Sequence, residues 1–213
     1  MPDPFAQLIP EARAFLAELS ANNTRDWFTA QKSRYDRELK APATLLLDQF
    51  ALQIGPGAGT KLFRPHRDVR FSKDKTPYNT HLHMLWTLPG DALQQPGFFF
   101  GISPDYVSIG GGVMGFDKEP LARWRDAVSG DFGKDMQALL AGYRDQGLRM
   151  DEPELKRVPP PFDKAHPHAD LLRRKSLTVW RDLPQAAFDA PLTALQDTWQ
   201  NLQPLFDRLR KVP

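Results

Sequence analysis

Apolar residues recur at helical spacing over the first quarter of the chain. The positions that show this spacing are Leu8, Ala12, Phe15, Leu16 and Leu19. They predict a helix over about 10–21, with Pro10 at a favourable place for the first turn. Asn23 is a suitable cap for a second helix that runs to about residue 40, and Pro42 begins a third. Helices are therefore predicted over about 10–54.

The pattern changes after the helix-breaking run Gly55-Pro56-Gly57-Ala58-Gly59. Shorter segments follow, and strands are predicted at about 66–72, 78–88, 97–103 and 106–113. The connections between them are short, whereas a parallel crossover needs a dozen or more residues. Residues 66–113 are therefore predicted to form an antiparallel meander.

Helical periodicity returns over about 117–211, beginning near Pro120. A short helix near 167–175, a candidate strand at 176–181 and a terminal helical segment interrupted by Pro204 are expected within this region. The whole pattern indicates an α+β fold, with a central antiparallel meander of about four strands flanked by N-terminal and C-terminal helices. The chain shows no internal repeat and no low-complexity linker, so residues 1–213 are predicted to form a single domain.

Composition limits the environment and the chemistry. The chain has no cysteine, which excludes disulfides and catalytic thiols and suits a reducing compartment. The N-terminus has acids and prolines where a signal peptide would have a basic start and an apolar run. No stretch approaches the roughly 18 to 20 apolar residues of a membrane span. We therefore expect a cytoplasmic protein that does not enter a membrane.

The basic character is concentrated in one segment. Residues 61–81 contain six Lys and Arg residues and two Asp residues, a local charge of +4 within a chain of net charge +2. The other 22 basic and 24 acidic residues leave −2. The segment spans the first predicted hairpin, with the turn at Lys73 to Pro77. It is the natural place to look for an anion site.

Four cations of this hairpin are the candidate anion anchors. They are Arg67, Arg70, Lys73 and Lys75, and Arg25 beside Trp27 is a fifth candidate. Strand alternation puts Arg70 on the less apolar face, next to a loop rich in hydrogen-bond donors. Arginine binds phosphate or carboxylate through two parallel hydrogen bonds. The first hypothesis is a pocket for a phosphate- or carboxylate-bearing small molecule, with Tyr78 and His81 as candidate proton-transfer groups if a reaction occurs.

Two other interpretations of the same cations remain open. The hairpin could be a surface module for a protein or, less in keeping with the low net charge, for nucleic acid. It could instead be a structural clasp in which the arginines pair with carboxylates and stabilise the sheet. The sequence contains none of the common hydrolase or kinase motifs, so no reaction is predicted.

Metal and cofactor sites are not expected. His81 and His83 share a strand face and His66 is nearby, but no third ligand is fixed and the surroundings are cationic. The string from Gly110 to Gly115 matches G-x-G-x-x-G, yet it follows a meander rather than a parallel βαβ unit. We interpret it as a flexible link between strand and helix.

The motif residues together resemble the domain of unknown function 2461 family of bacteria and fungi. The matching segments are 22–28 (NNTRDWF), 67–78 (RDVRFSKDKTPY), Thr80-His81, Gly110 to Gly112, Arg125, Leu155-Lys156-Arg157, His166-Pro167 and Lys175-Ser176. Leu177 stands where the family usually has Phe. The resemblance covers nearly the whole chain, and it implies no established activity.

Overall fold

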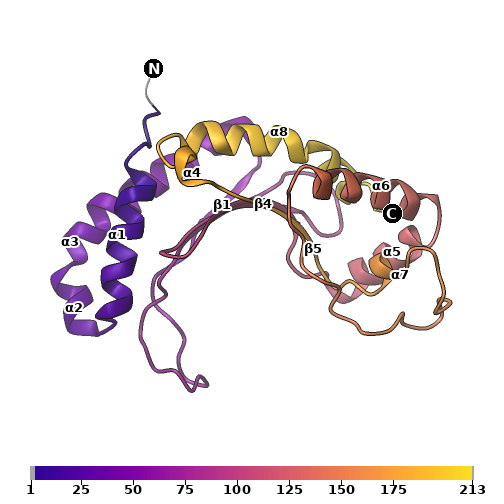
Figure 1. Ribbon diagram of the computed structural model, residues 1–213, viewed down its shortest axis with the longest axis horizontal. Helices are drawn as coiled ribbons and strands as arrows, with labels where there is room; N and C mark the ends of the chain where they lie inside the picture. The colour runs from indigo at the N-terminus through magenta and orange to yellow at the C-terminus, as the bar shows by residue number, and fades with distance from the viewer. Residues whose placement is uncertain (1–2, 213) are drawn as a thin grey trace. The chain divides into compact units, whose positions relative to one another are not determined.

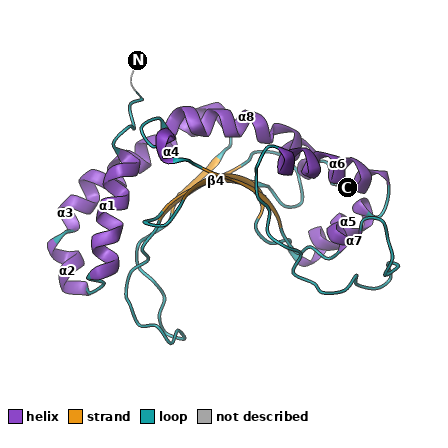
Figure 2. Cartoon of the chain, viewed as in Figure 1, coloured by secondary structure: helices purple, strands orange, loops and turns teal. Residues whose placement is uncertain are grey.

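The strands form one antiparallel sheet, in which five strands are hydrogen-bonded in sequence order. Figure 2 draws the strands in orange, and Figure 1 gives the same view coloured along the chain. The computed structural model describes residues 3–212. The strands are β1 (Gly59–Leu62), β2 (Leu82–Thr87), β3 (Gly97–Ile102), β4 (Val107–Val113) and β5 (Leu177–Asp182). The α+β class is confirmed, and the meander has five strands rather than about four.

The prediction of a strand at 66–72 is wrong. This segment makes only an isolated antiparallel bridge, between His66 and Tyr78, and β1 takes the edge position beside β2 instead. The prolines at 65 and 77 have no N–H to donate to a ladder, so pairing stops close to the bridge. β2 correspondingly begins at Leu82 and not at 78.

Residues 3–212 cluster into two compact units, which are described separately. Unit 1 consists of residues 3–86, 99–109 and 182–197, and unit 2 of residues 87–98, 110–181 and 198–212. Strands β3 and β4 and helix α8 (Pro191–Arg210) run from one unit into the other. The single-domain prediction stays a prediction.

Unit 1 holds the N-terminal helices and the first strands. Its helices are α1 (Leu8–Ala21), α2 (Arg25–Ala30), α3 (Lys32–Arg34), the π-helix η1 (Tyr35–Lys40), α4 (Ala41–Ile54) and the 3-10 helix η2 (Gln185–Ala187). One face of β2 is the core face, because Leu82, Met84 and Trp86 are at most 2% exposed. The Trp86 indole N–H donates to the Leu47 carbonyl of α4 at 2.9 Å, which fixes the strand against the helix.

The start of α2 differs from the expected cap. Thr24, and not Asn23, caps the helix, because its hydroxyl accepts the Trp27 N–H at 3.3 Å. The expected helix over about 23–40 is divided into α2, α3 and η1, and η1 continues directly into α4. Asn23 is therefore free to make a different contact, which is described below.

Unit 2 contains α5 (Lys118–Val128), α6 (Asp131–Asp145), α7 (Ala169–Leu172) and most of β5. The buried Trp124 of α5 donates its indole N–H to the Leu171 carbonyl at 3.1 Å and stacks on Phe116. Helix α8 continues through Pro204, so the expected interruption there is wrong. Burial of Leu202, Leu205 and Phe206 beside the proline offsets its lost hydrogen bond.

No helix within residues 3–212 is both long enough and apolar enough to cross a membrane.

Candidate functional site

The predicted hairpin is an irregular loop that links β1 to β2. We call residues 63–81 the basic loop, and Figure 2 draws the segment in teal. At its base, the Arg67 N–H donates to the Pro77 carbonyl at 2.9 Å and the Asn79 N–H donates to the Pro65 carbonyl at 2.7 Å. Together with the bridge between His66 and Tyr78, these bonds close the loop.

The base of the loop is anchored to the turn between α1 and α2. The Asn23 side-chain amide accepts the Tyr78 N–H at 3.1 Å and donates to the Tyr78 carbonyl at 2.9 Å. The Phe28 ring stacks on the Tyr78 ring, with centroids 4.1 Å apart and planes inclined by 19°. Tyr78 is only 5% exposed. The two longest motifs of the sequence thus meet here, and Tyr78 has an anchoring position.

Arg67 is turned back into the loop. Its guanidinium donates to the Asp74 carboxylate at 2.5 Å and to the hydroxyl of Thr76, and its side chain is 25% exposed. Asp74 also accepts the Thr76 N–H at 2.9 Å. This amide and then the Arg67 guanidinium lower the pKa of Asp74 to about 2. The structure therefore places Arg67 in an internal clasp.

Arg70 lies outside the clasp and on the surface. Its guanidinium makes two parallel hydrogen bonds to Asp68, at 2.9 and 2.7 Å, and its side chain is 77% exposed. The hydrogen bond from Arg70 lowers the pKa of Asp68. Lys75 donates to the carbonyl of Val69 at 3.0 Å and so stabilises the turn that carries Arg70. A solvent-exposed pair of this kind contributes little to stability, so a ligand anion can compete with Asp68 for Arg70.

The remaining cations of the segment form no ion pair, although, besides the hydrogen bonds from Arg70, the charge of Arg64 also lowers the pKa of Asp68. Asp68 and Asp74 are its only acids, and both are engaged by arginines. Within residues 3–212, no ion pair is formed by the four cations Lys61, Arg64, Lys73 and Lys75, all of which are exposed. Arg25 is also exposed, on the first turn of α2. The surface of the basic loop therefore carries an uncompensated positive charge.

His81, His83 and Tyr106 form a cluster where the basic loop leads into β2. The rings of His81 and His83 are stacked 3.8 Å apart, and His83 Nε2 is 2.7 Å from the hydroxyl of Tyr106. Burial lowers the pKa of His81, and burial followed by the charge of His81 lowers the pKa of His83 to about 4. Both rings are therefore neutral at pH 7. The sequence placed Tyr106 at the start of the strand predicted at 106–113 and gave no signal for a contact with His83, so its part in this cluster was missed.

Strand register explains how this cluster forms. His83 on β2 and Tyr106 beside β4 are separated by β3, where Gly101 lies beneath both rings. A Cβ at Gly101 would be 3.2 Å from the His83 ring and 3.3 Å from Tyr106. The missing side chain lets the two rings meet above the strand. Ser108 and Asp182 lie further along the same face, joined by a hydrogen bond of 2.5 Å.

Within residues 3–212, no three His, Cys, Asp or Glu side chains are grouped to hold a metal ion. His66 packs its ring edge against Phe28 and Tyr78, away from the stacked pair at 81 and 83. Of the three histidines of the sequence hypothesis, His81 and His83 therefore contact each other, whereas the ring contacts of His66 are with Phe28 and Tyr78.

The first three glycines of the string do not link strand and helix, and only its last glycine, Gly115, lies between β4 and α5. Gly110, Gly111 and Gly112 belong to β4, and α5 begins only at Lys118. A Cβ at Gly111 would be 2.4 Å from the Phe206 ring, and one at Gly112 would be 2.0 Å from the Leu177 carbonyl oxygen. Gly112 also has a φ of 138°. These glycines allow close packing within unit 2, so the interpretation as a flexible link is wrong for them.

The other basic motif residues belong to unit 2, whereas the basic loop belongs to unit 1. Glu154 accepts the Lys175 N–H at 2.8 Å and the Ser176 hydroxyl at 2.5 Å. Arg125 donates to the Leu172 carbonyl at 3.2 Å. The Glu154 contacts join the loop after α6 to the segment before β5, and the Arg125 contact joins α5 to α7, which gives Arg125 and the 175–176 segment a structural role in unit 2.

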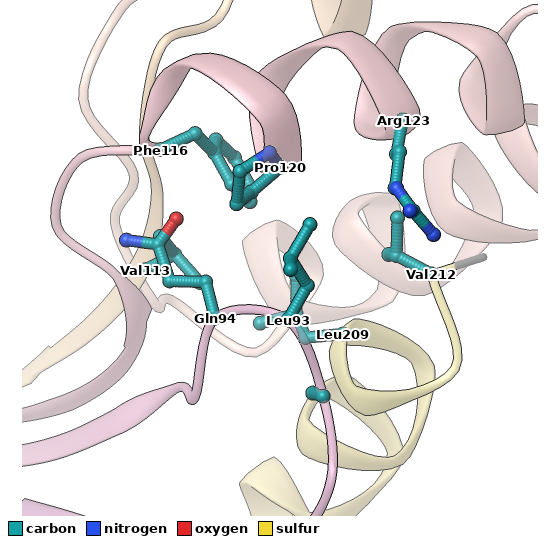
Figure 3. Close-up of a pocket in the computed structure, with 9 residues that line it drawn as sticks. Leu93, Gln94, Val113, Phe116, Pro120, Arg123, Leu209 and Val212 are labelled. Atoms are coloured by element: carbon teal, nitrogen blue, oxygen red, sulfur yellow. The ribbon is translucent and has the colours of Figure 1, made fainter.

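A small pocket of unit 2 is apolar (Figure 3). Its walls include Leu93, Val113, Phe116, Pro120 and Leu209, with Arg123 at one side. Its volume of about 20 Å³ is room for roughly one water molecule. It is too small for a metabolite, so the basic loop and the cluster beside it remain the stronger candidate.

Comparison with protein families gives one assignment. The model of a family described as a conserved hypothetical protein, DUF2461, matches residues 11–207 of the 213-residue chain. Comparisons with curated proteins and with solved structures gave no match. The matched region includes the basic loop, the Asn23 anchor, the glycines of β4 and the motif residues of unit 2. On this evidence the chain belongs to the DUF2461 family.

Proposed function

We propose that the basic loop binds a phosphate- or carboxylate-bearing ligand at its exposed surface. The observation that supports this is the charge imbalance of the loop. Both of its acids are engaged by Arg67 and Arg70, while Arg64, Lys73 and Lys75 of the loop, and Lys61 of the adjoining β1, form no ion pair. Hydrogen bonds between charged groups contribute roughly 1.5–3 kcal/mol, about twice as much as neutral ones. An anion would relieve the repulsion among these cations.

The fixed base of the loop supports the proposal. The amide of Asn23 and the ring of Phe28 hold Tyr78, and the clasp of Arg67 with Asp74 shapes the turn. A ligand would therefore meet a loop whose backbone is already ordered, and less conformational entropy would be lost on binding. The arrangement is open, which favours a surface site over an enclosed pocket.

For proton transfer, His81 fits this proposal better than Tyr78. The His81 ring is half-buried and its pKa is lowered by burial, so it is a neutral base at pH 7. Tyr78 is packed between Phe28 and His66. The cysteine-free composition further supports a cytosolic location as part of the proposal.

The test is titration calorimetry with inorganic pyrophosphate at low ionic strength. The double variant Arg64→Ala/Lys73→Ala removes two of the four cations, and we expect it to bind roughly tenfold or more weakly. The matched control is Lys118→Ala/Lys134→Ala, which removes the same charge from exposed lysines of unit 2. The control should retain most of the affinity, and its residual loss measures the effect of net charge alone.

The structural-clasp alternative predicts a different result. If the cations only stabilise the sheet, Arg64→Ala/Lys73→Ala lowers the melting temperature and leaves any pyrophosphate affinity equal to that of the control. That result would contradict the proposal.

A further inference from the structure

One aromatic side chain of the basic loop is almost fully exposed to solvent. Phe71, at the tip, is 96% exposed, more than any other large apolar residue within 3–212. Burial of a phenylalanine side chain stabilises a fold strongly, so the exposure of Phe71 forgoes a large stabilisation. The ring is therefore available to a partner outside the protein.

The tip that carries Phe71 is held in a turn. The Ser72 N–H donates to the Val69 carbonyl at 3.3 Å, and the Lys75 ammonium reaches the carbonyls of Val69 and Arg70 at 3.0 and 3.5 Å. The Arg70 guanidinium lies 5.9 Å from the centre of the Phe71 ring. These hydrogen bonds fix the turn, and the turn holds the Phe71 ring next to the Arg70 guanidinium.

An exposed aromatic ring among cations matches the chemistry of single-stranded nucleic acid. Bases stack on aromatic side chains with a contribution of roughly 1–3 kcal/mol each, while Lys and Arg contact the phosphates. A duplex hides the faces of its bases and offers only phosphates and groove edges. Free phosphate has no ring to stack. A strand with accessible bases uses both features of the tip, and its successive phosphates can reach several cations of the loop.

We propose that the basic loop binds single-stranded nucleic acid, with a base stacked on Phe71 and the flanking phosphates held by Arg64, Lys73 and Lys75. This inference rests on the proposed function, because it names the ligand class of the same loop. Its own additional support is the ring of Phe71, which the binding of a simple anion does not need.

A membrane surface is a poorer partner for the same tip. A single myristoyl chain gives only marginal membrane binding, and one phenylalanine buries much less apolar surface. Phe71 is followed by the polar Ser72 and Lys73, so no second apolar anchor extends the patch in that direction. Base stacking needs only the one ring.

The experiment is fluorescence anisotropy with a labelled single-stranded oligothymidine and a labelled hairpin duplex of equal charge. We expect the wild-type chain to prefer the single strand, and its affinity to fall steeply with salt. Phe71→Ala should weaken single-strand binding roughly 5- to 100-fold, as expected for one lost stack. Phe71→Trp should retain the affinity. Leu52→Ala, which removes an exposed apolar side chain from α4 of the same unit, is the matched control and should have no effect.

The outcomes separate this inference from the proposed function. If Phe71→Ala binds the oligothymidine as well as wild type does, or the duplex binds equally well, the inference fails while pyrophosphate binding can persist. Binding of anionic vesicles through Phe71, without oligonucleotide binding, would also overturn it in favour of a membrane. Both proposals are supported if Arg64→Ala/Lys73→Ala loses pyrophosphate binding, and if Phe71→Ala loses single-strand binding while Leu52→Ala keeps it.

Discussion

The side-chain amide of Asn23 makes two hydrogen bonds to the main chain of Tyr78, which lies 55 residues further along the chain. The amide presents one acceptor and one donor, as a neighbouring strand would. It therefore satisfies both backbone groups of Tyr78 at a point where the regular ladder of β2 has not yet begun. The position of the basic loop depends on this contact.

Replacement of Asn23 should loosen the base of the loop. We expect Asn23→Ala to lower the free energy of unfolding by about 1–3 kcal/mol, because two partly buried backbone groups lose their partner. Asn23→Asp keeps the acceptor but directs a carboxylate oxygen at the Tyr78 carbonyl oxygen, which repels it. We therefore expect Asn23→Asp to be no more stable than Asn23→Ala. Urea denaturation measures the effect. Asn22→Ala, which loses only an exposed bond to the Glu18 carbonyl, is the control and should change stability by less.

Arg70 and Asp68 should affect anion binding in opposite directions. Arg70→Ala removes a bidentate donor and should weaken pyrophosphate binding roughly tenfold or more, with the melting temperature nearly unchanged. Arg70→Lys should recover only part of this, since lysine lacks the planar fork. Asp68→Asn removes the internal competitor and should strengthen binding. Calorimetry that finds both Arg70→Ala and Asp68→Asn neutral would place the anion site elsewhere.

The sequence predicted some elements well because their signals are local. The apolar spacing of residues 8–19 predicted α1, and the short turn at Ser103 to Tyr106 predicted β3 and β4 as antiparallel neighbours. β1 was missed because Gly59–Leu62 shows no apolar alternation, and 66–72 was mistaken for a strand because Val69 and Phe71 do alternate. Phe71 is in fact at the exposed tip.

The candidate site was predicted only as a concentration of charge. Composition placed the positive segment at 61–81, but it could not show that Arg67 turns inward to Asp74 while Arg70 stays outside. That choice depends on how the loop closes. The contact between His83 and Tyr106 also had no sequence signal, because it depends on strand register and on Gly101 between the two rings.

The glycines of β4 should tolerate no side chain. In Gly112→Ala the new Cβ would meet the Leu177 carbonyl oxygen in a backbone with φ of 138°, so we expect a destabilisation of about 3 kcal/mol or more. A Cβ added at Gly142 of α6 would have nothing within 4 Å, and Gly142→Ala should stabilise the chain by about 0.5–1 kcal/mol. Thermal unfolding of the two variants should give shifts of opposite sign. A neutral Gly112→Ala would contradict the packing of β4.

The stacked histidines should make the folded state sensitive to mild acid. The pKa of His83 is lowered from 6.5 to about 4. Between these two pH values, the His83 side chain is therefore mostly protonated in the unfolded chain and mostly neutral in the folded chain. The contribution of neutral His83 to stability is therefore complete above pH 6.5 and is lost as the pH falls from 6.5 towards 4. His81 adds to the effect in the same direction, since burial lowers its pKa too.

The measurement is the free energy of unfolding at pH 7.5 and at pH 5.5, for wild type and for His83→Gln. Glutamine stays neutral and can still bond to Tyr106, so the variant should lose much of the difference between the two pH values. Tyr106→Phe keeps its ring above Gly101 but lacks the 2.7 Å bond, so it should be destabilised by about 0.5–1.5 kcal/mol at pH 7.5 and keep the pH dependence. If His83→Gln is as acid-sensitive as wild type, the burial of His83 is not the cause, and other titrating groups must account for the loss of stability.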